Sequence, residues 1–452
     1  MTLPAAAILL LLLLPGAKLS AQRDPAEPPQ AKPAPKPLPR PAGAISRREV
    51  DAAGMRGLIE QLVACGTRNS LASWTDPHRG PGCGRDHIVA RLNEIAKHSG
   101  GKLQVVVDKF ETSSARTGNK SVPMENVYGI LPGSDPQLAK TVFIISGHFD
   151  SRASDVMNPN LDAPGADDDA SGVAVSLECA RLLSRTGANG SRSYRATLLF
   201  AAVSGEEQGL LGAERLLSWA KQQGYNIGAM LDNDIVGADS APGAPHRVRL
   251  FSGPGEQDDA DSPSRELARA IEEIAGRDAI RLIFSLDRLG RGGDHEPFYR
   301  AGLPAVRFTE PLEDYRHQHQ TPRTENAVEY GDQMKYLNLE FAANVARANA
   351  AALRQLALAP AAPANVELSG GITPDAKIAW SAAGDPDRAG FEILWRETTD
   401  PRWQVFHLVT TAGETSLTGV STDNHFFAVR SVGKNGARSI AVAASAPRTL
   451  PF

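Results

Sequence analysis

Histidine and aspartate side chains follow an apolar run near the middle of the chain. The segment TVFIISGHFDSR starts at Thr141 and places His148 and Asp150 directly after the run. The later segment GADDDASG carries three consecutive aspartates, residues 167–169, just before a helical pattern. Imidazole and carboxylate groups at the end of a buried strand are the ligands that a divalent metal ion needs. This stretch therefore predicts half of a metal site.

Candidates for the other half follow the later apolar runs. They are Glu206 and Glu207 after residues 197–203, Asp232 and Asp234 after residues 229–231, and His317 and His319 after residues 305–308. Active sites of parallel sheets lie beyond the carboxyl ends of the strands, so these groups can converge. Residue type alone leaves open the choice within the last two pairs. For the three aspartates, helix capping is a competing role.

The elements that must position these side chains follow an alternating strand and helix pattern. Strands are expected at residues 103–107, 124–131, 141–146, 197–203, 229–231, 247–251, 281–284 and 305–308. Helices are expected at residues 48–64, around 88–95, and at 170–183, 209–221, 263–275 and about 330–358. Apolar strands separated by helices predict an α/β fold, with a central, mostly parallel mixed sheet that helices cover on both faces.

The pattern changes after residues 359–364, which are expected to be a linker. Short alternating runs in WSAAGDPDRAGFEILWR and NHFFAVRSVGKNGARS predict a small all-β sandwich at residues 365–449. These segments resemble a fibronectin type III module, in which Trp380 would be the core tryptophan. Phe426 or Phe427 stands where such modules carry a hallmark tyrosine.

The start of the chain predicts export. Residues 4–14, PAAAILLLLLL, form an apolar block typical of a signal-peptide core, with cleavage expected after Ala21. Residues 22–45 are rich in proline and alanine and are expected to form an extended linker. Because the rest of the sequence has no apolar run long enough to cross a membrane, we expect a secreted or periplasmic protein that is not membrane-bound after cleavage.

The cysteines are consistent with this compartment. Cys65 and Cys83 bracket a Gly/Pro-rich segment, and in an exported protein a disulfide between them is expected to contribute about 3 kcal/mol. Two free thiols are the alternative in a cytosolic protein. Cys179 lies in an apolar helical pattern and is expected to be a buried thiol. The net charge of −4, without a long basic run, gives nucleic-acid binding no electrostatic support.

Five motifs together resemble a known family. GHFDS, GADDDASG, SGEEQGLLG, LDNDIVG and HQHQ occur in the order found in the secreted co-catalytic zinc aminopeptidases, metallopeptidase family 28. The resemblance covers about residues 120–330 and implies a zinc exopeptidase fold for a domain at residues 46–358.

The resemblance also implies roles for individual residues. His148 and Asp234 would hold one zinc ion, Glu207 and His319 a second, and Asp168 would bridge both. Glu206 would be the general base. Asp294 and His295 are expected to orient substrate or support the site. The tyrosine that stabilises the oxyanion in some relatives has no clear match, and the nearby Arg291 is expected to take its place. Asp150 is placed to accept the second N–H of the His148 imidazole.

This chemistry predicts a secreted aminopeptidase with two Zn2+ ions and peptide substrates. Two metal ions can share and activate a water molecule, and a free carboxylate beside them can move its proton. Carboxypeptidase or glutaminyl cyclase activity on the same fold is one alternative, and a non-catalytic binding protein is another. The cyclases resembling this fold use a single zinc, whereas both ligand sets are complete here.

Overall fold

The computed structural model describes residues 45–445, except for 186–192, 240–245, 256–260, 370–372 and 412. The expected signal peptide and almost all of the expected proline-rich linker lie outside these residues. Within the described ranges, no helix is long and apolar enough to cross a membrane.

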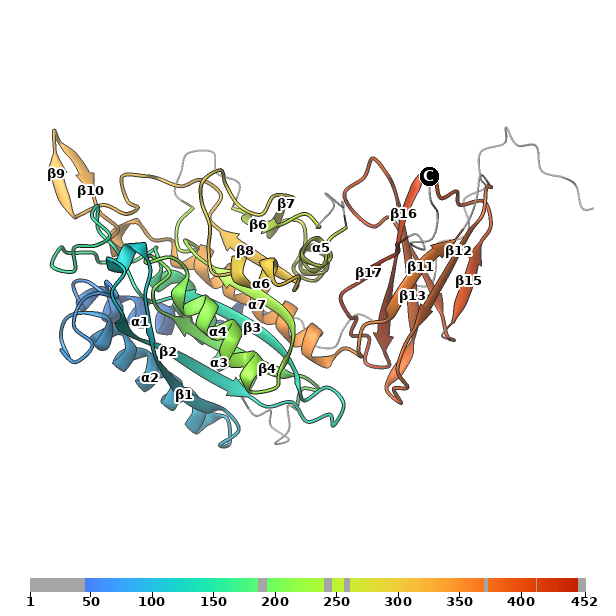
Figure 1. The fold of residues 1–452 in the computed structure, drawn as a ribbon, viewed down its shortest axis with the longest axis horizontal. Helices are drawn as coiled ribbons and strands as arrows, with labels where there is room; N and C mark the ends of the chain where they lie inside the picture. Colours follow the sequence, from blue (N-terminus) through green and yellow to red (C-terminus); the bar gives the residue numbers. More distant parts are fainter. Residues whose placement is uncertain are drawn as a thin grey trace, which may run out of the picture. The chain divides into compact units, whose positions relative to one another are not determined.

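An eight-stranded mixed sheet forms the centre of the fold (Figure 1), with the order β1-β2-β4-β3-β5-β8-β6-β7. Parallel pairs join β4, β3, β5 and β8 in the middle of the sheet, and β6 to β7 at one edge. Antiparallel pairs join β1 to β2, β2 to β4 and β6 to β8. The strands are β1 (Gln104–Thr112), β2 (Val122–Leu131), β3 (Thr141–His148), β4 (Thr197–Val203), β5 (Asn226–Asn233), β6 (Val248–Ser252), β7 (Ile280–Ile283) and β8 (Ala305–Thr309).

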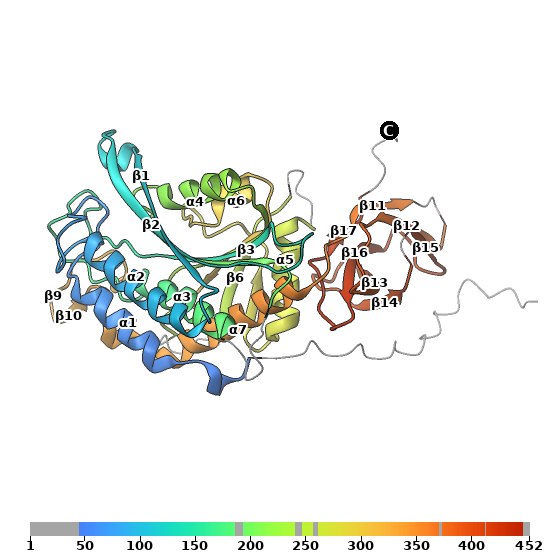
Figure 2. The ribbon, with the colours of Figure 1, turned by 90° about the horizontal axis from the view of Figure 1, so that it is seen from below.

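Helices cover both faces of this sheet, as the sequence predicted. On one face lie α1 (Ala52–Ala64), α2 (Pro81–His98), α3 (Ala170–Ser184), α5 (Pro263–Ala275) and α7 (Leu339–Leu358). On the other lie α4 (Leu211–Gln222) and α6 (Glu296–Arg300), as Figure 2 shows. Alternate residues of one strand serve the two cores: Ile145 packs on the first face and Ile144 on the second. The fold class is therefore an α/β mixed sheet, as expected.

The predicted start of the last helix is wrong. The expected helix begins near Tyr330, but this residue ends a short hairpin of β9 (Arg323–Glu325) and β10 (Val328–Tyr330). A 3₁₀ turn, η3 (Met334–Tyr336), follows before α7 begins at Leu339. Asn338 is the N-cap, because its side chain accepts hydrogen bonds from the backbone N–H groups of Glu340 and Phe341.

The C-terminal region is all β, as expected. One sheet has the order β11-β12-β15 and the other β14-β13-β16-β17. The core between them contains Trp380 and Phe427, which are both buried. The strands are β11 (Ala364–Ser369), β12 (Ala376–Ser381), β13 (Arg388–Glu397), β14 (Val405–Val409), β15 (Glu414–Leu417), β16 (His425–Gly433) and β17 (Val442–Ala443). β11 and β15 were not predicted, since one adjoins the alanine- and proline-rich segment and the other is short and polar.

Helix α5 contacts this C-terminal region through polar side chains. The Trp403 Nε1–H donates to Glu266 Oε2 over 2.8 Å, and Arg402 donates to both carboxylate oxygens of Glu272 over 2.7 and 2.8 Å. Arg430 pairs with Glu273 at 2.7 Å. The described residues of both regions belong to one compact unit, so the two regions are joined by a contact surface as well as by the chain.

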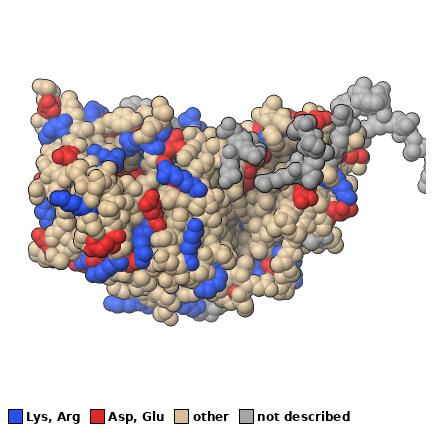
Figure 3. Space-filling model, viewed as in Figure 1, with Lys and Arg blue, Asp and Glu red and all other residues tan. Residues whose placement is uncertain are grey.

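Charged side chains are interspersed on the face drawn in Figure 3. Lysine and arginine alternate there with aspartate and glutamate, without a broad patch of one sign. The cysteines agree with the prediction: Cys65 and Cys83 form a disulfide, and Cys179 is a buried free thiol.

Candidate active site

Strand ends and the loops that follow them bring five predicted residues together in two groups that share one carboxylate. The first group contains His148, Asp168 and Asp234, and the second contains Asp168, Glu207 and His319. His148 Nε2 lies 3.1 Å from Asp168 Oδ1 and 3.7 Å from Asp234 Oδ1. His319 Nε2 lies 2.8 Å from Asp168 Oδ2 and 3.1 Å from Glu207 Oε1. Asp168 therefore directs one oxygen to each group.

The atoms of these groups fit metal ligation. Within each group, the candidate ligand atoms all lie within 4.8 Å of one another. Asp234 Oδ1 and Glu207 Oε1 are buried and make no hydrogen bond within the described part of the chain. A buried carboxylate oxygen without a hydrogen-bond donor is costly unless a cation faces it. Imidazole nitrogen mixed with carboxylate oxygen is a donor set that suits zinc.

The electrostatics of the cluster also favour positive charge at its centre. Burial lowers the pKa of His319, but the neighbouring carboxylates of Glu207 and Asp168 outweigh it and raise that pKa to about 10. At His148, burial is again outweighed, by Asp150, Asp168 and Asp234, and the pKa is raised well above its usual value. The ligand carboxylates thus stabilise positive charge on the two imidazole groups, and they would stabilise a bound metal cation in the same way.

Hydrogen bonds to the backbone fix the loop that carries Asp168. Asp169 is the N-cap of α3, as expected, accepting from Gly172 N–H, and it also accepts from His148 N–H over 2.9 Å. Asp332 accepts from the N–H groups of Asp167 and Asp168 over 2.8 and 2.7 Å. Sequence reasoning missed Asp332, because only the fold brings it to this loop.

Asp150 lies beside His148, but its carboxylate has a further role. His148 Nδ1 is 3.1 Å from the Asp150 backbone carbonyl and 3.4 Å from its Oδ1. The Asp150 carboxylate also accepts from the N–H groups of Glu206 and Glu207, over 3.3 and 3.2 Å. One carboxylate therefore holds the turn that presents both glutamates.

The segment closed by the disulfide between Cys65 and Cys83 forms hydrogen bonds with the loops that carry the site residues. Arg68 is fully buried and donates from Nε to Phe149 O over 2.6 Å and from Nη2 to Gly165 O over 2.8 Å. Ser70 Oγ accepts from Gly205 N–H over 3.0 Å. These contacts reach the segments just before Asp150, Asp168 and Glu206.

Arg307 on β8 is a second residue that sequence reasoning missed. Its buried guanidinium pairs with Asp234 Oδ2 at 2.7 Å and Asp287 Oδ2 at 2.8 Å. This pairing leaves Asp234 Oδ1 to face His148. The available signal was an arginine inside the otherwise apolar strand AVRFT.

The alternative candidates Asp232 and His317 lie outside the two ligand groups. Asp232 pairs with His295, whose Nδ1 is 3.2 Å from Asp232 Oδ2. His295 thus orients a carboxylate outside both groups. His317 stacks on Tyr336, with ring centroids 3.5 Å apart. Asp294 is buried, and neither carboxylate oxygen has a hydrogen-bond partner among the described residues.

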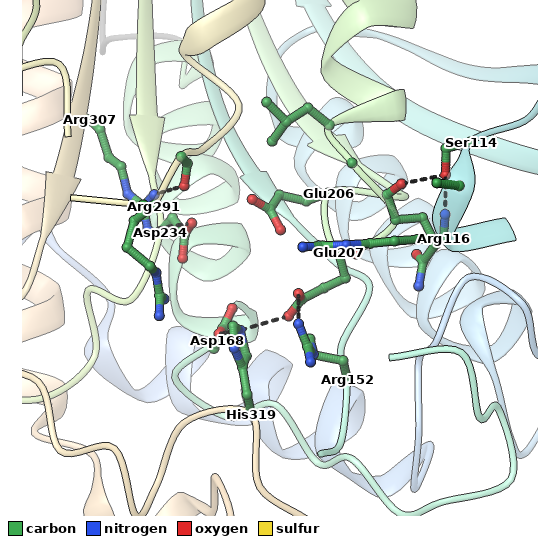
Figure 4. A pocket seen from close by; sticks show the side chains of 16 residues that line it. Ser114, Arg116, Arg152, Asp168, Glu206, Glu207, Asp234, Arg291, Arg307 and His319 are labelled. Atoms are coloured by element: carbon green, nitrogen blue, oxygen red, sulfur yellow. Dashed lines mark hydrogen bonds and ion pairs between the residues drawn. The ribbon is translucent and has the colours of Figure 1, made fainter. Parts of the chain in front are cut away.

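A cavity of about 510 Å³ opens over the two groups (Figure 4). Glu206 lines it but belongs to neither group, and Arg291 lines it on the side of Asp234. Burial raises the pKa of Glu206 well above its usual value, against the opposing effect of His148. One carboxylate in the cavity is therefore free of both ligand groups.

The family follows from comparison with known proteins. A family model described as peptidase family M28 matches residues 126–353. The chain belongs to peptidase family M28. A probable zinc metalloprotease of Leptosphaeria maculans is 38% identical over 416 residues, which cover 87% of this chain and 94% of that relative.

Solved structures of Legionella pneumophila proteins share the fold of this M28 member. LapB aligns with a TM-score of 0.51 at 18% identity, over 69% of this chain and 74% of that chain. The LapA aminopeptidase aligns with a TM-score of 0.49 at 18% identity, over 69% of this chain and 73% of that chain. At 18% identity, the likeness to LapB shows a common fold alone.

Proposed function

We propose that this M28 peptidase is a secreted zinc-dependent aminopeptidase, which removes N-terminal residues from peptides. One observation carries the proposal: two ligand groups share Asp168, and Glu206 lies free beside them in the same cavity. Family membership and the zinc metalloprotease named among its relatives support it.

The proposed roles follow from the two groups. His148 and Asp234 would hold one zinc ion, Glu207 and His319 the other, and Asp168 would bridge them. Zinc ions held there would activate the attacking water and polarise the scissile carbonyl. Glu206 takes a proton from the attacking water and delivers it to the leaving amine. Arg291, on the wall beside Asp234, would stabilise the negative charge on the carbonyl oxygen.

The chain's residues favour this reaction over the alternatives. A glutaminyl cyclase with one zinc ion would need only one ligand set, whereas both groups are complete here. A binding protein without activity would not need Glu206 beside complete ligand sets. A carboxypeptidase would use the same metal ligands and general base. The reporter substrates in the test below therefore distinguish carboxypeptidase from aminopeptidase activity.

The test uses the purified full-length protein with a panel of aminoacyl and carboxy-terminal reporter substrates. We expect hydrolysis of aminoacyl substrates, its loss on chelation, and its return when zinc is added back. Cleavage of the carboxy-terminal reporters alone would replace aminopeptidase by carboxypeptidase. A zinc-loaded protein that is inactive on every substrate would refute both.

Two variants separate the proposed base from a ligand. Glu206→Gln should lower kcat by about 100-fold or more and leave two zinc ions bound, since general-base catalysis contributes on that scale. Glu207→Gln should instead lower the zinc content measured by atomic absorption. Full activity in Glu206→Gln would remove this residue from the mechanism.

We further propose that residues 1–21 are a signal peptide and that residues 365–449 form a fibronectin type III-like accessory module. Trp380 in the core between the two C-terminal sheets supports the second assignment. The mature protein should then be found outside the cytoplasm, with Gln22 as its first residue by N-terminal sequencing.

A further inference from the structure

Two arginines stand beside the second ligand group, on the wall of the cavity. Figure 4 shows Arg116 and Arg152 near Glu207, whereas Arg291 and Arg307 lie near Asp234. Arg116 belongs to η2 (Ala115–Thr117), in the connection between β1 and β2, and Arg152 follows β3. Two segments that are distant in the sequence therefore bring guanidinium groups to one side of the cavity.

The connection that carries Arg116 is held at the cavity by two hydrogen bonds to backbone carbonyls. Ser114 Oγ–H donates to the Gln208 carbonyl over 2.7 Å, and Arg116 Nη1 donates to the Glu207 carbonyl over 2.8 Å. Arg116 has no carboxylate within ion-pair distance in the described part of the chain. Its charge is thus unpaired at the cavity wall.

Arg152 makes only long contacts. Its Nη1 is 3.8 Å from Glu207 Oε2, and its Nε and Nη2 donate to the carbonyls of Ala153 and Ser154 over 3.3 and 3.5 Å. Glu207 is at the same time 3.1 Å from His319 Nε2 through its other oxygen. The one carboxylate near Arg152 is therefore shared with the second ligand group.

The charges that line the cavity do not balance once each acid is given its role. Among the described lining residues, the acids are Asp168, Glu206, Glu207 and Asp234. Three of them belong to the ligand groups, and Glu206 is the proposed base. Arg307 is paired with Asp234 and Asp287. No lining carboxylate is left for Arg116 and Arg152, and divalent ions in the site would add further positive charge.

We propose that Arg116 and Arg152 bind a carboxylate of the peptide substrate, which makes the enzyme selective for acidic substrates. The carboxylate is supplied either by an aspartate or glutamate side chain next to the scissile bond or by the chain terminus of a short peptide. Guanidinium groups suit this role, because their N–H fork matches the geometry of a carboxylate. The proposal rests on the peptidase function above and names the substrate class of that site.

The test compares substrate pairs that differ only in charge. One pair varies the cleaved residue (Glu against Gln aminoacyl reporters), and a second varies the residue after it (Leu-Glu-amide against Leu-Gln-amide). A third varies the terminus (Leu-Gln against Leu-Gln-amide). We expect kcat/KM to favour the charged member of at least one pair by about tenfold or more, as charge-assisted hydrogen bonds do. The pair that shows the preference identifies the source of the carboxylate.

Variants assign the preference to the arginines. In the Arg116→Gln/Arg152→Gln double variant, the ratio within that pair should fall to near one. The control Arg56→Gln removes an exposed cation of α1, which is paired with Glu60 at 3.6 Å, and should keep the wild-type ratio. The zinc content of all variants is measured, so that loss of metal is not mistaken for loss of selectivity.

A binding measurement gives a readout without turnover. Calorimetric titration of zinc-loaded Glu206→Gln with the favoured pair should show tighter binding of the charged peptide, and addition of the two arginine substitutions should abolish the difference. Hydrolysis of neutral and acidic members at equal rates in all three pairs would overturn the proposal and leave the peptidase function intact. A preference that persists in the double variant would also overturn it. Absence of any hydrolysis by the zinc-loaded wild type would instead contradict the proposed function.

Discussion

Individual residues of the site differ in how far the sequence alone could predict them. The candidate ligands His148, Glu207 and Asp234 follow apolar runs directly, so their convergence could be expected from the geometry of a parallel sheet. Arg307 and Asp332 could not be expected, since their partners are set by strand order and loop packing. The same holds for the two arginines at the cavity wall. The local sequence pattern thus predicts which ligand side chains follow a strand. The residues that hold these ligands in place depend on the tertiary fold.

Arg307 should position Asp234 for metal binding. Replacing it by methionine leaves two buried carboxylates, Asp234 and Asp287, without their shared cation. We expect Arg307→Met to lower the free energy of unfolding of the metal-free protein by about 3 kcal/mol, as loss of one partner of a buried ion pair does.

The same variant should weaken zinc binding at the position of His148 more than at that of His319. Calorimetric titration with zinc measures both sites, and Arg307→Lys, which keeps a charge but not the forked geometry, is the matched comparison. If Arg307→Met bound zinc at both sites with wild-type affinity, Asp234 would not need Arg307 to position it.

At the level of elements, the sequence pattern predicted which helices and strands exist better than it predicted where they begin and end. The strand at Thr197–Val203 and the helix after Asp169 lie where expected, because an unbroken apolar run and a capping aspartate are local signals. The predicted start of α7 near Tyr330 was wrong, because Tyr330 ends the hairpin strand β10 and the 3₁₀ turn η3 follows before the helix. Tertiary contacts, including the hydrogen bond from Asn338 N–H to the Gly237 carbonyl, determine where the helix starts.

The cap of α7 gives an element-scale prediction. Asn338→Ala removes the acceptor for two backbone N–H groups and should lower the free energy of unfolding by about 1 kcal/mol. Asn338→Ser keeps a capping oxygen and should recover part of that loss. Chemical denaturation of the three proteins measures the difference, and equal midpoints would show that α7 is held by its packing alone.

For the whole molecule, the contact between α5 and the C-terminal sheets makes stability depend on pH. Glu266 is buried, and burial raises its pKa to about 7 despite the opposing effect of Arg269. An acid whose pKa is higher in the folded than in the unfolded state binds more protons when folded. Its contribution to stability is therefore complete below about pH 4.5 and is lost as the pH rises to about 7.

Glu266→Gln should remove this dependence. Between about pH 4.5 and 7 the wild type should lose about 3 kcal/mol relative to the variant, because the amide has no proton to release. The Trp403 Nε1–H can still donate to the amide oxygen. Unfolding free energies measured across this range give the difference curve, and a flat curve would place the titration of Glu266 outside the range.

The disulfide between Cys65 and Cys83 has a consequence for when the enzyme becomes competent. It closes the segment whose Arg68 and Ser70 hold the loops before Asp150, Asp168 and Glu206. Opening it, by reduction or in Cys65→Ser/Cys83→Ser, should cost about 3 kcal/mol and loosen the metal site first. Zinc affinity should then fall before global unfolding, which titration with zinc in the presence and absence of reductant would detect. A chain in a reducing environment would thus be a poor zinc binder and a poor protease, and formation of the disulfide would serve as its activation step.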